Sequence, residues 1–207
     1  MFKFHYEKFT KSRVEAFSDG VFAIIVTLLV LDLRIPDLKI ENNQELIQGI
    51  IDVLPKIFIW ISSFLITCVI WMNHHRIMET FKTIDAGIFW LNNMLLMATS
   101  LIPFPTAMLG THPHLEAAAS FYGICLTLSA SCFVFIRIYA VRHPEIFKEG
   151  VDVGAFRKGI RRTLTYACFT YLGGAVLSWV DTRIGLALYL LIPLYFIIPR
   201  VQEEKSH

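Results

Sequence analysis

The residues best able to do chemistry in this sequence stand inside an apolar stretch near its beginning. Residues 13–32 read RVEAFSDGVFAIIVTLLVLD, and Ser18, Asp19 and Gly20 interrupt the first half. A carboxylate inside a membrane-embedded helix costs about 3 kcal/mol or more, so it usually faces protein or water and marks a pathway. Only 12 uncharged residues separate Asp19 from Asp32, whereas a lipid-facing helix needs about 20. The stretch therefore predicts a helix that forms the inner wall of a membrane protein.

The composition agrees with a membrane-embedded chain. Of its 207 residues 55% are hydrophobic and 17% are charged, whereas soluble domains carry about 25% charged residues. The four cysteines all fall in apolar runs without metal-binding spacing, so we interpret them as small apolar side chains. The first apolar run lacks a small-residue cleavage site, which favours a retained span over a signal peptide. We expect a multi-pass all-α protein that binds no nucleic acid and needs no cofactor.

Six apolar stretches predict six transmembrane helices in a single domain over residues 1–207. Prolines mark several of their limits: Pro36 ends the first span, Pro103 and Pro105 break the third, and Pro199 closes the sixth. A short interfacial helix is expected at 43–53. The predicted spans cover about 13–33, 54–77, 85–109, 116–141, 162–180 and 184–199.

Lysine and arginine predict the orientation, because cytosolic loops carry an excess of both. With the N-terminus inside, 15 of the 19 basic residues lie on the cytosolic side. Arg34, Lys39, Lys56 and Arg183 are the four that fall outside. Both termini are therefore expected in the cytosol.

A helical wheel divides the first span into two faces. Six residues share one stripe about 100° wide, namely Phe17, Gly20, Ile24, Thr27, Leu28 and Leu31. Asp19 lies about 140° from Ile24 and Ser18 about 120° away on the other side. Either the stripe is ordinary helix packing, or it faces a symmetry axis while Ser18 and Asp19 point into neighbouring helices.

Candidate partners for Asp19 lie at the cytosolic end of the second span. Trp71, Asn73 and His74 carry N–H donors that a carboxylate can use, and the Arg13 guanidinium is another donor at the same depth. Taken alone, Trp71 also fits an interfacial anchor. Adjacent histidines project apart on a helix, so His74 and His75 do not predict a metal site.

These residues carry a resemblance to a known family. Arg13, Phe17, Ser18 and Asp19 match the Arg-x-x-x-Phe-Ser-Asp signature of the transmembrane protein 175 family of potassium channels. The run WMNHHR at 71–76 resembles the family's Trp-x-x-His-His pattern, and LIPFPTAMLG at 101–110 resembles its Leu-Pro-Phe-x-Thr-x-Leu-Gly run. Prokaryotic members carry one six-span unit, as this chain does, which implies a homotetramer in a lipid bilayer, namely the prokaryotic inner membrane.

The resemblance also implies site roles. In the family the first helices line the pore, and the isoleucine that forms the constriction matches Ile24. Helical spacing then places Leu28 and Leu31 in further rings. The signature residues Arg13, Phe17, Ser18 and Asp19 position the helix. Thr27 is either a polar contact for the permeating potassium ion or is bonded back to its own helix, and Asp32 either attracts cations or is an exposed helix-end charge.

Two other classes of function remain open. A membrane transporter that uses Asp19 as a proton or cation relay predicts saturable, proton-coupled flux, and such proteins commonly contain an inverted repeat, which this sequence does not show. An integral-membrane enzyme would need a metal or nucleophile constellation, and the His and Asp spacings indicate none. The resemblance implies a potassium-permeable cation channel with a hydrophobic constriction, and the sequence agrees in lacking a Thr-Val-Gly-Tyr-Gly filter loop.

Overall fold

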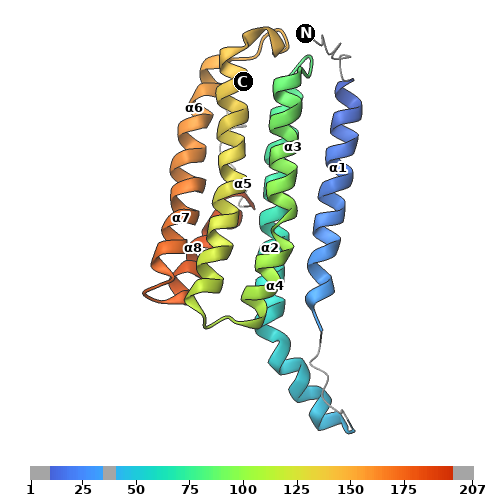
Figure 1. The fold of residues 1–207 in the computed structure, drawn as a ribbon, viewed down its shortest axis with the longest axis vertical. Coiled ribbons are helices and arrows are strands. Elements are labelled where there is room, and N and C mark those ends of the chain that lie inside the picture. The colour runs from blue at the N-terminus through green and yellow to red at the C-terminus, as the bar shows by residue number, and fades with distance from the viewer. Residues whose placement is uncertain (1–9, 35–40, 198–207) are drawn as a thin grey trace, which may run out of the picture.

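A computed structural model describes residues 10–34 and 41–197, and helices account for nearly all of them. Within these residues the only β-pairing is an isolated bridge between Phe81 and Phe147. The all-helical prediction is therefore confirmed. The elements in chain order are α1 (Lys11–Leu28), η1 (Leu29–Asp32), α2 (Asn43–Thr80), α3 (Ala86–Ser100), α4 (Pro103–Thr111), α5 (Glu116–Arg142), η2 (Pro144–Ile146), α6 (Val153–Thr163), η3 (Leu164–Cys168), α7 (Phe169–Leu177) and α8 (Thr182–Ile197) (Figure 1).

Four segments are long and apolar enough to cross a membrane. They are α1 with η1, α2, α3 with α4, and α5. The fifth predicted span, 162–180, covers the last two residues of α6, the π-helical turn η3 and α7. The rest of α6 precedes it and is rich in basic residues. The sixth corresponds to α8, a shorter apolar helix. The count of six spans and the cytosolic termini stay predictions; Pro36, Pro199 and both termini lie outside the described residues.

Two prolines act differently on the predicted helices. The expected interfacial helix at 43–53 and the second span form one continuous helix, because Pro55 lies inside α2 instead of ending it. Figure 1 shows the first part of α2 leaning away from the bundle. Proline removes one helical hydrogen bond and favours such a bend. In the third span α3 ends at Ser100 and α4 begins at Pro103.

Side-chain caps fix where three helices begin. The Asn42 side chain accepts from the backbone N–H of Glu45, Asp85 from that of Ile88, and Asp152 from that of Ala155. Each bond satisfies one of the backbone donors that the first helical turn leaves unpaired. The cap at Asp85 sets the start of α3, the helix that supplies a partner for α1.

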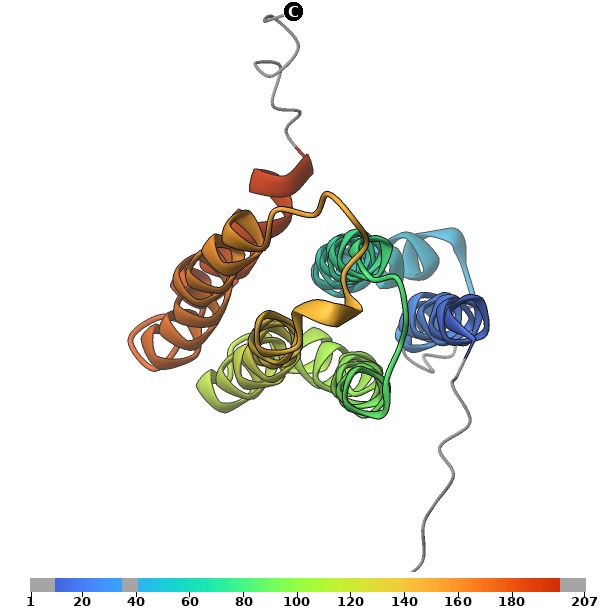
Figure 2. The same cartoon turned by 90° about the horizontal axis from the view of Figure 1, so that it is seen from above.

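The helix α1 stands at the rim of the bundle and contacts α2 and α3 (Figure 2). The helices α6, α7 and α8 lie on the other side of the molecule, against α5 and α2. The core between them is apolar, with Ile88, Leu95, Ile102 and Leu109 fully buried. One side of α1 is therefore packed, and the other has no partner among the described residues.

Candidate functional site

The helix α1 presents two faces with different surroundings. Residues at helical spacing pack against α2 and α3, and they are Val14, Ser18, Phe22, Ile25 and Leu29. The opposite side is apolar and exposed: Phe17 is 58% exposed, Ile24 59%, Leu28 42% and Leu31 58%. An apolar helix face in this setting faces lipid or another protein surface. All six residues of the predicted stripe lie on this exposed side.

The polar residues of the exposed face are few. The Thr27 hydroxyl donates to the backbone carbonyl of Ile24 at 2.8 Å, which is the bond back to its own helix. Its oxygen lone pairs remain able to accept from water or to contact a cation. Asp32 is exposed at the last residue of η1. A Cβ added to Gly20 would meet nothing within 4 Å, so the chain itself leaves open space beside this part of α1.

On the packed face, Ser18 joins a buried polar network. The Asn92 side chain of α3 donates from Nδ2 to Ser18 Oγ at 3.0 Å, and Ser18 donates to the Val14 carbonyl at 2.8 Å. Nε2 of His74 on α2 lies 2.8 Å from Oδ1 of Asn92. An amide oxygen only accepts, so His74 donates from Nε2. Ser18, His74 and Asn92 are almost fully buried, and their bonds fix α1, α2 and α3 relative to one another.

Asp19 has a different partner. The Trp71 indole Nε1 donates to Asp19 Oδ1 at 2.8 Å. Asp19 is thus bonded to the neighbouring helix α2 through Trp71, one of its candidate partners. Both side chains are exposed, so the carboxylate lies at the edge of the α1–α2 contact.

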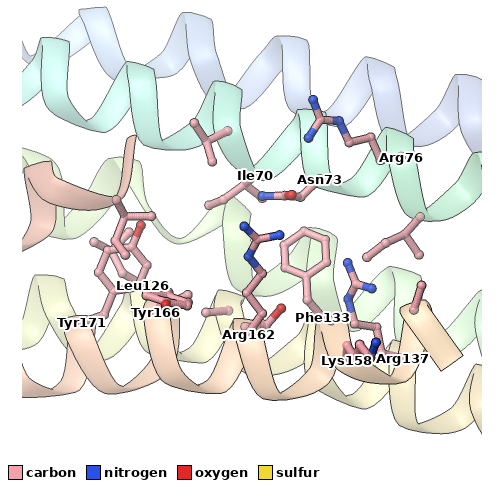
Figure 3. A pocket seen from close by; sticks show the side chains of 18 residues that line it. Ile70, Asn73, Arg76, Leu126, Phe133, Arg137, Lys158, Arg162, Tyr166 and Tyr171 are labelled. Carbon is pink, nitrogen blue, oxygen red and sulfur yellow. The ribbon is translucent and has the colours of Figure 1, made fainter. Parts of the chain in front are cut away.

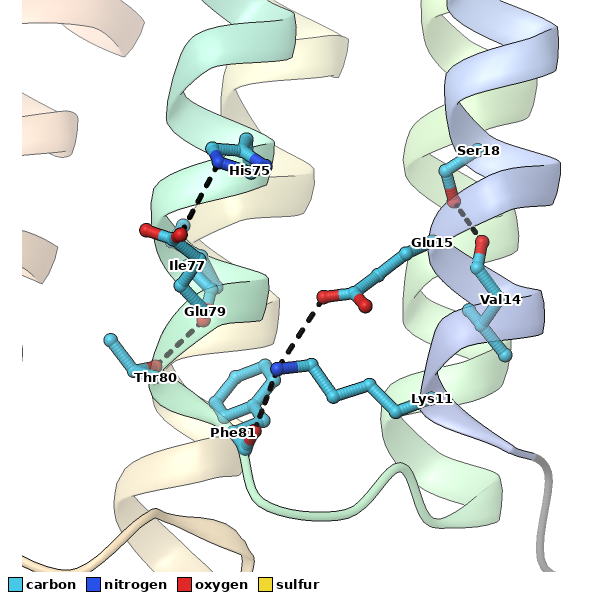
Figure 4. Close-up of polar contacts among 9 residues, drawn as sticks. All are labelled: Lys11, Val14, Glu15, Ser18, His75, Ile77, Glu79, Thr80 and Phe81. Carbon is cyan, nitrogen blue, oxygen red and sulfur yellow. Dashed lines mark hydrogen bonds and ion pairs between the residues drawn. The ribbon is translucent and has the colours of Figure 1, made fainter.

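A further tether holds the beginning of α1 (Figure 4). Lys11 Nζ donates to the carbonyl oxygen of Phe81, just after the end of α2, at 2.9 Å. The same ammonium group lies 3.4 Å from Glu15 Oε1 on α1. Cations are favoured near the C-terminal end of a helix, where the last carbonyls lack partners. This contact attaches the first turn of α1 to the end of α2, on the N-terminal side of the Ser18 network.

The remaining predicted residues do not join these networks. The Arg13 side chain is exposed and forms no hydrogen bond or ion pair with the described part of the chain, and Phe17 is exposed beside it. Asn73 lines a cavity between α2, α5 and α6 instead of approaching α1 (Figure 3). Of the three residues expected at the end of the second span, Trp71 contacts Asp19, and His74 reaches Ser18 through Asn92.

Asn92 and Lys11 are the contacts that sequence reasoning missed. Asn92 stands with Asn93 in the middle of the apolar run of α3. An amide inside a membrane helix is favoured where it bonds across helices, so its position was the available signal. The geometry as a whole anchors a helix, and within the described residues no group of three or more His, Cys, Asp or Glu side chains could hold a metal ion.

Comparison with known families gives a match over the first half of the chain. Residues 13–103 match the family described as endosomal/lysosomal potassium channel TMEM175. This range contains α1 from Arg13 onward and every residue of the Ser18 and Asp19 networks.

Individual proteins resemble nearly the whole chain. A protein of Chamaesiphon minutus named as a potassium channel is 34% identical over 199 residues, covering 92% of this chain and 95% of that one. Another of Chryseobacterium, also named as a potassium channel, is 32% identical over 200 residues, covering 95% and 97%. The crystal structure of a lysosomal potassium-selective channel TMEM175 homolog from Chamaesiphon minutus superposes with a TM-score of 0.78 at 30% identity, over 90% of this chain and 95% of that one.

Proposed function

The chain belongs to the TMEM175 family of ion channels, and from this premise we propose that four copies form a potassium-permeable cation pore in a prokaryotic inner membrane. Each copy contributes the exposed face of α1 to the pore wall. Bacterial relatives named as potassium channels support the choice of ion.

The observation that carries the proposal is the pairing of two faces on one helix. The packed face of α1 is fixed by Ser18, and the other face exposes Ile24, Leu28 and Leu31. A pore wall needs both properties, since the wall must hold its position while leaving its inner side open. In four copies these three residues form stacked apolar rings. Such a constriction gates by dewetting, because a narrow apolar ring excludes a hydrated ion.

Polar residues beside the rings have subordinate roles in this proposal. Thr27 offers its lone pairs to an ion or its water between the rings of Ile24 and Leu28. Four copies of Asp32 at one mouth of the pore raise the local cation concentration. Conduction that depends on a wetted constriction predicts modest discrimination between potassium and sodium, since no rigid cage replaces the hydration shell.

The signature residues act as a clamp and not as an ion site. Ser18 and Asp19 tie α1 to α3 and α2 on one side. Arg13 and Phe17 are exposed on the side that neighbouring copies would cover, so we assign them to contacts between subunits. Any movement of α2 or α3 then moves α1 and changes the diameter of the pore.

Two measurements on the full chain test the proposal. Native mass spectrometry of the detergent-purified protein should give four copies per particle. Liposomes loaded with potassium should release it down its gradient, at a rate that rises linearly with the gradient and does not depend on a proton gradient. A monomeric particle would contradict a pore formed by four copies. Saturable flux that requires protons would favour the transporter alternative with Asp19 as relay.

A further inference from the structure

A cavity of about 470 Å³ lies away from α1, between α2, α5, α6 and the turn η3 (Figure 3). Its volume is within the range of small-ligand sites. Four basic side chains line it, and no acidic side chain does so among the described residues. The basic residues are Arg76 of α2, Arg137 of α5, and Lys158 and Arg162 of α6.

The lining changes character along the cavity. Figure 3 shows Arg76, Arg137 and Lys158 at one end, Arg162 between, and Leu126 and Tyr171 at the other end. Leu126 and the aromatic ring of Tyr171 make the second end largely apolar, and Ile70 and Ile192 add apolar side chains to the lining. A molecule that matched both ends would carry a negative group joined to a hydrocarbon part.

The Arg137 side chain is held in place by residues of α6. Its guanidinium lies over the ring of Phe156 on α6, with Cζ 4.8 Å from the ring centroid. A side chain at Gly159 would collide with Arg137 Nη1, so the glycine makes room for the guanidinium. Arg137 Nε is buried and has no hydrogen-bond partner in the described residues. A buried unpaired N–H is costly, and an anionic oxygen bound in the cavity would satisfy it.

We propose that this cavity binds an anionic phospholipid, with its phosphate among the basic side chains and the start of an acyl chain against Leu126 and Ile192. Guanidinium groups bind phosphate through paired hydrogen bonds, and basic pockets between membrane helices on the cytosolic side bind acidic headgroups. A soluble anion would leave the apolar end unused. The basic end lies where α2 and α5 finish, the end predicted to face the cytosol.

The proposal is independent of conduction, because the cavity lies apart from α1. The π-helical turn η3 forms part of the wall through Tyr166 and Ala167. Such turns are rare and often stand at functional sites, because the extra residue widens the helix and re-aims its side chains. The site would link α6 to the core helices α2 and α5 through a bound lipid.

Native mass spectrometry of the detergent-purified oligomer, titrated with dioleoylphosphatidylglycerol or dioleoylphosphatidylcholine, tests the proposal. We expect the anionic lipid to give adducts on the native chain at a concentration roughly tenfold lower than the zwitterionic one. The double variant Arg76→Gln/Lys158→Gln should lose this preference. Both side chains are exposed, so the variant should fold.

The matched control is Arg157→Gln/Arg161→Gln. These two residues lie on the same helix as Lys158, are exposed and do not line the cavity. The control removes the same charge and should keep the preference for the anionic lipid. Equal losses in the two double variants, or equal binding of the two lipids to the native chain, would overturn the proposal.

A second arm separates lipid from soluble anion. Phosphatidylglycerol should raise the melting temperature of the native chain more than inorganic phosphate does. If inorganic phosphate raised the melting temperature as much as phosphatidylglycerol does, the basic end would bind a free anion and the lipid assignment would be wrong. Arg137→Gln serves as an additional variant whose melting temperature is measured first, since Arg137 also packs on Phe156.

Discussion

The indole Nε1 of Trp71 on α2 donates to Oδ1 of Asp19 on α1 at 2.8 Å, across 52 residues of sequence. The adjacent Ser18 accepts from Asn92 on α3. Two consecutive residues of α1 are thus bonded to two different helices at one depth. A helix held on two sides keeps its rotation about its own axis, and that rotation decides which side chains it presents on the free face.

The first prediction concerns this Trp71–Asp19 bond. Trp71→Phe removes the donor and Asp19→Ala the acceptor, and a double-mutant cycle of the two should give a coupling energy of about 1 kcal/mol, the scale of hydrogen bonds between membrane helices. The measurement is the thermal unfolding of each variant in the same detergent. Additive effects would mean that the bond contributes nothing to stability.

Asp19→Asn also tests the clamp against an ion-site role. We expect fewer assembled oligomers or reduced conduction. The channels that still conduct should have an unchanged ratio of potassium to sodium permeability. A well-assembled variant with altered selectivity would assign Asp19 to the ion pathway.

The second prediction concerns Asn92. Asn92→Leu removes both bonds of the amide and leaves Ser18 and His74 buried with unmet donors or acceptors, which should cost about 1–3 kcal/mol of stability. Asn93→Leu is the matched control, because the Asn93 side chain, among the residues that the structure describes, bonds only to the Phe89 carbonyl on its own helix. Chemical denaturation of the two variants should separate them, and equal losses would contradict the role of the network.

Much of α1 could be predicted from sequence, because a helical period of 3.6 residues decides which side chains share a face. That period groups Ile24 with Leu28 and sets Ser18 apart, as the structure has them. The partners could not be found in this way. Asn92 lies 74 residues from Ser18, and only the packing of α3 beside α1 brings them together.

Asn73 was expected near Asp19 because it adjoins His74 in the sequence, and the structure places it elsewhere. Consecutive residues on a helix point in directions that differ by about 100°. Asn73 therefore faces the cavity beside α5 and α6, while His74 faces Asn92. The sequence predicted separate helices at 43–53 and 54–77, but α2 runs through both and through Pro55, because one missing hydrogen bond bends a long packed helix without ending it.

The third prediction concerns the contact of α3 with α5. A Cβ at Gly87 would collide with the Tyr139 ring, whose hydroxyl donates to Asp85 Oδ2 at 2.8 Å. Gly87→Ala should therefore lower the melting temperature, since either the ring or the cap at Asp85 must move. Gly173→Ala is the control, as a Cβ there meets nothing within 4 Å; it should be neutral or slightly stabilising.

The fourth prediction concerns the hydroxyl of Thr27. Thr27→Val keeps the shape of the side chain and removes a group that is exposed and bonded only to its own helix. We expect normal folding and a lower potassium-to-sodium permeability ratio, measured from reversal potentials under bi-ionic conditions. A permeability ratio equal to that of the native chain would mean that the Thr27 hydroxyl does not contact the ion and serves only the hydrogen bond to Ile24.

The last prediction tests the constriction itself. Ile24→Asn places an amide on the ring expected to be narrowest, and a polar ring wets more readily than an apolar one. Single-channel recording in a planar bilayer should show a larger conductance and a smaller preference for potassium. Val30→Asn is the control, because Val30 is exposed in η1, directly after α1, but lies about 120° from Ile24 on a helical wheel, and it should leave both quantities unchanged. If the two variants conduct alike, Ile24 does not form the constriction and the pore wall must be sought on another face of the bundle.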